Sequence, residues 1–286
     1  MNRLSKTGIE YGDLSWNFYP GCLHKPQGKC PVSGCWAEGM YKRQMGAAKK
    51  GIILPDFHHP HLIPELLLAP LSVKKPARIL VNFMGDLFGD WIDPNEIVHP
   101  EDAGQPNKYS SEARNWSLQV LIRQVISDCP QHTFIFLTKN PAGLAAWSPF
   151  PDNCWVGVSA TNWMQFSNAL GYLAPVQLKA KVKFISFEPL LERIEFDMMQ
   201  KMLFRSTIQW IILGQQTPAK ASTTPKIEWA QEIALAATKA NVPLFIKDNL
   251  KSLLPNRMPF WCPVSWRENG VTMTENRLRQ EFPKES

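Results

Sequence analysis

Three cysteines close together in the chain are the residues whose type and spacing suit metal chemistry. Cys22, Cys30 and Cys35 share one loop that is rich in Gly, Pro and Lys, GCLHKPQGKCPVSGC. Such a loop can turn its thiolates toward one point. Three thiolates suit a 4Fe-4S cluster with one iron left open, or a zinc ion completed by a fourth ligand, for which His24 is available. The loop is therefore a candidate metal site.

The cell compartment of the protein decides whether these cysteines can form disulfides. The N-terminal stretch lacks the apolar core of a secretory signal, so we expect a cytoplasmic protein whose cysteines do not form disulfides. No apolar run approaches the roughly 18 residues of a membrane helix, and no membrane partner is expected. The formal charge of +6 permits a polyanionic partner, but Lys and Arg are spread along the chain and favour an ordinary solvated surface.

Short apolar runs recur along the chain and predict the elements that position the loop. Strands are predicted over 79–86, 134–139, 154–160, 183–189, 208–214 and 242–247, with a weaker one over 14–18. Because the runs are continuous rather than alternating, they are typical of parallel strands buried on both faces. Helices are predicted between them over 110–127, 162–173, 191–202 and 225–240. This βα order predicts an α/β fold, a partial (β/α) barrel over residues 1–250, with an irregular C-terminal extension over 251–286 packed on it.

Polar residues stand at the ends of the predicted strands. In a βα barrel these ends meet at one mouth, where active sites are built, so we expect most of them to face one cavity. The loop after the first strand brings the cysteines to the same mouth, which favours a cluster over a structural zinc ion. Simpler roles remain open, since Asp86 can cap a following helix and Glu188 can pair with a lysine. The strand-end residues are Asp86, Lys139, Ser159, Glu188, Gln215, Gln216 and Lys247.

Seven segments carry a resemblance to a known family. They are SWNFYPGC, CWAEGM, ILVNFMGDLFGDW, FIFLTKNP, NCWVGVSA, FISFEPLL and WIILGQQ. In this order they resemble a phage-associated radical SAM-like family of largely unassigned function, over about residues 9 to 250. The resemblance implies a partial barrel similar to that of spore photoproduct lyase, which binds a 4Fe-4S cluster and S-adenosylmethionine.

The resemblance implies a role for each candidate residue. Cys22, Cys30 and Cys35 would hold three irons of the cluster, and the fourth iron would bind S-adenosylmethionine. The remaining roles concern the cofactor itself: Gly85 and Asp86 would bind its methionine amino group, Ser159 and Glu188 its ribose or carboxylate surroundings, and Lys139 or Lys247 its carboxylate. We therefore expect a radical SAM enzyme that takes electrons from an external donor and abstracts hydrogen from an unidentified substrate, either a nucleic acid or a peptide.

The sequence departs from the family pattern at three points. The cysteine spacing is C-x7-C-x4-C, longer than the family's loop, and Trp36 stands where the family has Tyr. Gln215 and Gln216 replace a Gly-Glu pair, which removes a carboxylate from the predicted mouth. Two other interpretations therefore stay open: a zinc- or cluster-containing nucleic-acid-binding protein without catalysis, and a barrel that has lost its cluster.

Overall fold

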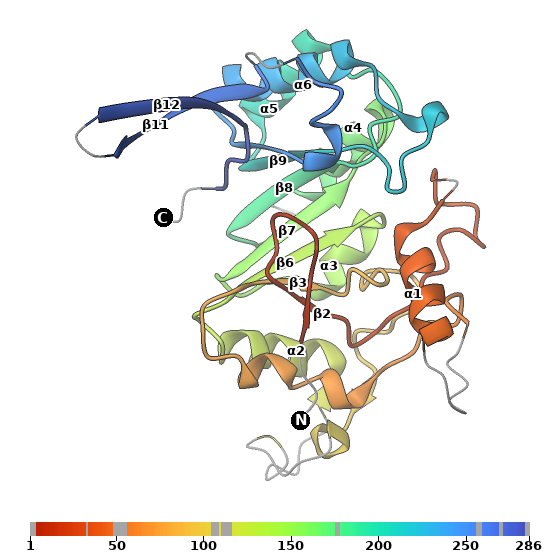
Figure 1. Ribbon diagram of the computed structural model, residues 1–286. Coiled ribbons are helices and arrows are strands. Elements are labelled where there is room, and N and C mark those ends of the chain that lie inside the picture. Colours follow the sequence, from red (N-terminus) through yellow and green to blue (C-terminus); the bar gives the residue numbers. More distant parts are fainter. Residues whose placement is uncertain are drawn as a thin grey trace. The chain divides into compact units, whose positions relative to one another are not determined.

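The computed structural model describes residues 4–32, 34–47, 56–103, 109, 116–174, 178–255, 259–268 and 271–283. The chain divides into two compact units, whose elements are labelled in Figure 1. Unit 1 comprises Met1–Val158 and Pro175–Lys181, and unit 2 comprises Ser159–Ala174 and Val182–Ser286. The expected boundary at residue 250 stays a prediction.

The strands of unit 1 are short and mostly parallel. They are β1 (Ser5–Lys6), β2 (Leu14–Trp16), β3 (Arg78–Val81), β6 (Thr133–Thr138) and β7 (Cys154–Ser159). Their order is β1-β2-β3-β6-β7, and only β1 pairs antiparallel with its neighbour. Every residue of β7 is buried, as expected for a strand covered on both faces. The predicted strand over 79–86 ends early because Asn82, at φ 58°, turns the backbone into the left-handed region.

Helices and a small second sheet complete unit 1. They are α1 (Trp36–Ala47), α2 (Leu118–Ser127), α3 (Leu144–Trp147), the 3-10 helices η1 (Pro64–Leu66), η2 (Ala69–Ser72), η3 (Pro100–Ala103) and η4 (Pro141–Gly143), and the antiparallel pair β4 (Ile97–Val98) and β5 (Trp116–Ser117). Helix α2 begins after Ser117, whose hydroxyl accepts the Val120 amide, and it buries an apolar face. The first part of the helix predicted over 110–127 lies outside the described residues.

Unit 2 repeats the alternation of strand and helix. Its parallel strands are β8 (Val182–Phe187), β9 (Trp210–Leu213) and β10 (Leu244–Ile246), in that order. Its helices are α4 (Trp163–Tyr172), α5 (Phe196–Arg205), α6 (Ile227–Lys239), η5 (Ala221–Thr223) and η6 (Asp248–Leu250). Helix α6 buries four alanines and Ile233, which lets it pack closely against its neighbours.

The C-terminal segment is more regular than the sequence predicts. Instead of an irregular extension, β11 (Trp261–Glu268) and β12 (Val271–Leu278) form a long antiparallel hairpin that extends from the helices of unit 2 (Figure 1). The segment after it packs on the unit's sheet: the Trp210 indole donates to the Glu281 carbonyl at 2.7 Å and stacks on Phe282. This final segment therefore packs within unit 2.

The α/β class with parallel strands is confirmed. Among the described residues, unit 1 has a mostly parallel array of five strands and unit 2 has a parallel array of three. Within each unit the described strands form an open array that does not close into a barrel. No helix of the described residues is long and apolar enough to cross a membrane.

Candidate functional site

Two glycines bring the cysteine loop onto the end of β3. Gly21 bridges to Gly85, and its amide donates to the Met84 carbonyl at 3.0 Å. A Cβ on Gly85 would lie 2.5 Å from the Gly21 carbonyl oxygen, so a side chain there would force the two backbones apart. Gly21 also has φ 103°, which disfavours other residues. Gly85, expected to contact a cofactor, thus sets the close approach that brings Cys22 next to Asp86.

Cys22 and Cys35 share one environment. Both pack against the buried cluster of Ala37, Tyr41, Phe57 and Met84. The pKa of the Cys22 thiol is raised to about 12, mainly by burial and also by the nearby Asp86 and Cys35, although the backbone N–H of His24 and the Lys139 charge act to lower it. The Cys35 sulfur also accepts the Glu38 amide at the start of α1. These two cysteines and Asp86 therefore lie within electrostatic reach of one another.

Cys30 lies in the same loop with a different partner. Its thiol donates to the Val32 carbonyl at 3.9 Å, and its amide donates to the His24 carbonyl at 3.1 Å. All three cysteines of the loop are half-buried thiols that form no disulfide. Among the described residues, no group of three His, Cys, Asp or Glu side chains is already placed to hold a metal ion. A metal would therefore have to draw the loop together.

Asp86 is the buried centre of a hydrogen-bond network. Its carboxylate accepts the Thr138 hydroxyl at 2.7 Å, the Lys139 amide at 2.9 Å and the Phe88 amide at 3.1 Å. The fourth partner is the Nε2 atom of His24, at 2.8 Å. The Phe88 amide lies in a turn and not in a helix, so this contact is not the helix cap that the sequence left open. The carboxylate links the ends of β3 and β6 to the cysteine loop.

A ring of ion pairs surrounds this centre. Lys29 pairs with Asp90 at 2.5 Å, and Asn140 donates to the same carboxylate, so the pKa of Asp90 is lowered. Glu38 accepts from Lys42 and Lys25, and the bond from Lys42 is the main reason that its pKa is lowered. The exposed Lys139 contributes its backbone to Asp86 and its charge to Cys22. Lys25, Lys29 and Lys42 are therefore paired with carboxylates, and the pKa of Cys22 stays raised in spite of the Lys139 charge.

The strand-end residues of unit 2 form a second polar group. Glu188 and Lys247 make an ion pair, one of the pairings that the sequence left open. The methylene groups of both side chains flank Gly214, where a Cβ would lie 3.1 Å from Lys247 Cδ and 3.2 Å from Glu188 Cγ. Any larger residue at position 214 would therefore push the two side chains away.

Several buried side chains of unit 2 lack a partner. The Ser159 and Ser186 hydroxyls and both polar atoms of the Gln216 amide make no hydrogen bond within the described part of the chain. Gln215, by contrast, is fixed by Asn249, which accepts its backbone amide at 3.2 Å and donates to its carbonyl at 2.8 Å. Ser186 was not singled out by sequence, because a serine inside an apolar strand gives no chemical signal.

The predicted site residues therefore fall into two groups. Cys22, Cys35, Asp86 and Lys139 meet in unit 1, and Glu188 and Lys247 meet in unit 2, which also contains Ser159. Sequence reasoning missed Thr138 as a partner of Asp86. Its position directly before Lys139, in a predicted strand end, was the available signal.

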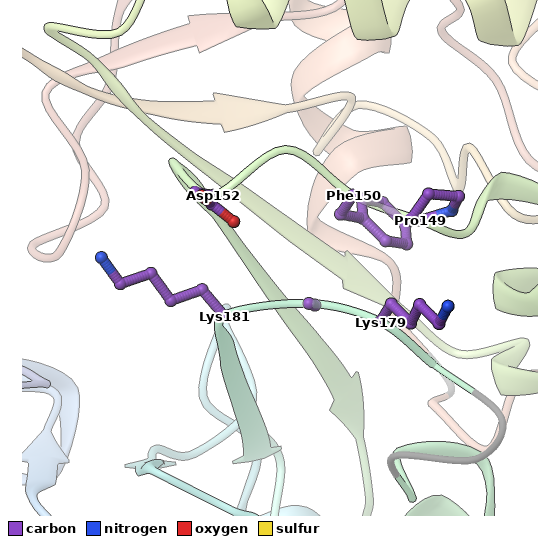
Figure 2. A pocket seen from close by; sticks show the side chains of 6 residues that line it. Pro149, Phe150, Asp152, Lys179 and Lys181 are labelled. Atoms are coloured by element: carbon purple, nitrogen blue, oxygen red, sulfur yellow. The ribbon is translucent and has the colours of Figure 1, made fainter.

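A separate cavity lies at the opposite end of the unit 1 strands. It has a volume of about 500 Å³ and is lined by Pro149, Phe150, Asp152, Lys179, Ala180 and Lys181 (Figure 2). Asp152 comes just before β7, so this cavity adjoins the amino end of that strand. In Figure 2 the side chains of Lys179 and Lys181 extend in different directions. None of the predicted site residues lines this cavity.

A family model matches the chain over residues 6–100 and 111–253, and its members are described as proteins of unknown function, DUF5131. The chain belongs to the DUF5131 family. The DUF5131 match includes the three loop cysteines and every strand-end residue named above. Searches of the curated proteins and of the solved structures found no match. The site must therefore be interpreted from its own chemistry.

Proposed function

We propose that this protein is a radical SAM-type enzyme, which uses a 4Fe-4S cluster and S-adenosylmethionine to abstract hydrogen from a substrate. The observation that carries the proposal is the shared setting of Cys22, Cys35 and Asp86 at the carboxyl end of β3, with Cys30 in the same loop. The carboxyl ends of parallel strands are where α/β folds build their reactive sites.

The donor set fits a site-differentiated cluster. Three thiols outside any disulfide would supply one ligand to each of three irons and leave the fourth iron open to another ligand. Because burial raises the pKa of Cys22 to about 12, its thiolate needs the compensating charge of a metal. When bound, the cluster and S-adenosylmethionine together supply a 5'-deoxyadenosyl radical.

The chain's own residues would bind and orient these groups. Gly85 permits close backbone approach at the loop, and the Lys139 ammonium supplies positive charge beside Cys22, where a methionine carboxylate would also be favoured. The roles toward the cofactor's ribose and carboxylate that the resemblance implies for Glu188, Lys247 and Ser159, which belong to unit 2, stay predictions. An external donor provides the electron, and the substrate class is a nucleic acid or a peptide.

Metal analysis and cofactor cleavage test the proposal. Protein purified or reconstituted without oxygen should be brown, carry about four irons and four sulfides per chain, and convert S-adenosylmethionine to 5'-deoxyadenosine and methionine after reduction. Cys30→Ala should lose both cluster and cleavage, whereas Cys262→Ala, outside the loop, should retain both. Colourless protein with one zinc ion per chain would instead support the non-catalytic alternative.

A further inference from the structure

His24 lies between Cys22 and Cys30 in the three-cysteine loop, and its main chain contacts other residues of this loop. Its backbone N–H lies near enough to Cys22 to lower the pKa of that thiol, and its carbonyl accepts the amides of Lys29 at 2.8 Å and Cys30 at 3.1 Å. The side chain is 4% exposed, and its ring lies edge-on to Trp91 with the centroids 4.9 Å apart. A buried imidazole thus lies between two of the cysteines that would bind metal.

The hydrogen bond to Asp86 determines which ring nitrogen of His24 is available. The Asp86 carboxylate already accepts three other hydrogen bonds, so Nε2 of His24 acts as the donor across their 2.8 Å contact. In the neutral ring Nδ1 then carries the lone pair. This atom is buried and has no partner among the described residues.

We propose that His24 Nδ1 is a fourth protein ligand of the metal centre held by Cys22, Cys30 and Cys35, and that S-adenosylmethionine displaces it when the cofactor binds. The proposal rests on the proposed function, because it assumes the cluster. A metal-binding histidine commonly donates its other ring N–H to a carboxylate, and His24 and Asp86 have this arrangement. The Nδ1 lone pair, which has no partner among the described residues, would bind the fourth iron, which has no thiolate ligand.

Asp86 then becomes a positioning residue rather than a cofactor ligand. Its oxygens are occupied by His24, Thr138 and two backbone amides, so it holds the imidazole in place from the ends of β3 and β6. An ammonium group on the cofactor would have to displace one of these partners to reach it. The resemblance assigns Asp86 to that ammonium, and the hydrogen bonds favour the positioning role.

Pulsed electron paramagnetic resonance of the reduced cluster tests the ligand directly. Wild-type protein is prepared with and without 15N-labelled histidine, in the absence of S-adenosylmethionine. We expect a strong nitrogen coupling that changes from the 14N to the 15N pattern on labelling and disappears when the cofactor is added. A cluster-bearing protein without histidine coupling would overturn this inference alone. Protein that forms no cluster at all would overturn the proposed function as well.

Three variants identify the histidine and the role of Asp86. His24→Ala should lose the coupling, whereas His58→Ala, which removes a ring bonded to the Cys22 carbonyl at 3.0 Å, should retain it. Asp86→Asn should weaken the coupling because the neutral amide holds the imidazole less firmly. A coupling that persists in His24→Ala would contradict the assignment, and an unchanged coupling in Asp86→Asn would contradict the positioning role.

Discussion

The polar groups at the strand ends of the two units differ in how fully they are paired. In unit 1 the Asp86 carboxylate has four partners, which come from the cysteine loop, from the turn that follows Asp86 and from the end of β6. In unit 2 the Ser186 hydroxyl and the Gln216 amide are buried without a partner within the described residues, beside strands of the same parallel kind. The difference shows that a polar strand end can hold a loop in place or leave hydrogen-bonding capacity for a ligand or water.

Replacing Asp86 should produce the largest loss of stability in unit 1. Asp86→Ala leaves His24, Thr138 and two backbone amides without their acceptor in a buried place, so we expect the free energy of unfolding to fall by about 3–5 kcal/mol. Urea unfolding measures this loss. Asp90→Ala is the matched control, because Asp90 also accepts from a lysine and an asparagine but is half exposed. It should cost at most about 1 kcal/mol. Equal losses in the two variants would mean that burial does not distinguish the carboxylates.

The Glu188 and Lys247 pair should show strong coupling in unit 2. Glu188→Gln or Lys247→Met alone leaves one charge in a mostly buried place, and each should cost about 2–3 kcal/mol, since both side chains retain only limited solvent contact. The double variant should cost clearly less than the sum of the two. Unfolding free energies from all four proteins give the coupling energy. Additive losses would show that the two side chains act independently.

Ser186 of unit 2 and Thr138 of unit 1 differ in whether the buried hydroxyl has a hydrogen-bond partner. Ser186→Ala removes a hydroxyl that has no partner among the described residues, so stability should stay the same or rise by up to about 1 kcal/mol. Thr138→Val removes a donor to the Asp86 carboxylate and should cost about 1.5–3 kcal/mol. The denaturation midpoints of the two variants should therefore move apart. A loss above about 1 kcal/mol in Ser186→Ala would reveal a bound water or partner.

The sequence predicts the main strands well because strands that are buried on both faces consist of continuous apolar runs. Strands β6, β7 and β8 have this pattern and lie close to the predicted ranges. The hairpin of β11 and β12 lacks such a run, and its Pro- and Trp-punctuated sequence therefore predicts irregular structure. A strand that pairs only with its neighbour in a hairpin does not need to be apolar on both faces.

Contacts between distant residues explain why the site could be predicted only in part. The residue types of Cys22, Asp86 and Glu188 identify them as chemically capable, and one simple role anticipated from sequence, the pairing of Glu188 with a lysine, does occur. The network around Asp86 depends on contacts across 62 residues to His24 and 52 residues to Thr138. No local pattern encodes such pairings. The orphaned Nδ1 of His24 follows from them and was equally out of reach.

The smallest expected change in the free energy of unfolding is a pH-dependent one at His132. Like His24, this residue has a buried Nδ1 without a partner among the described residues. Burial lowers the pKa of His132, whose Nε2 contacts the Val73 carbonyl at 3.1 Å and whose Nδ1 has no partner among the described residues. The unfolded chain therefore takes up this proton at a higher pH than the folded protein. Stability from the neutral ring is fully present above about pH 6.5 and falls as the pH drops toward the lowered pKa, by at most about 1.4 kcal/mol per pH unit.

His132→Gln should reduce the difference in unfolding free energy between pH 8 and pH 5.5, whereas His59→Gln, on the surface, should leave it unchanged. If His132→Gln has the same pH dependence as the wild type, the proton is taken up elsewhere, and burial of an unpartnered imidazole nitrogen is not by itself costly in this unit.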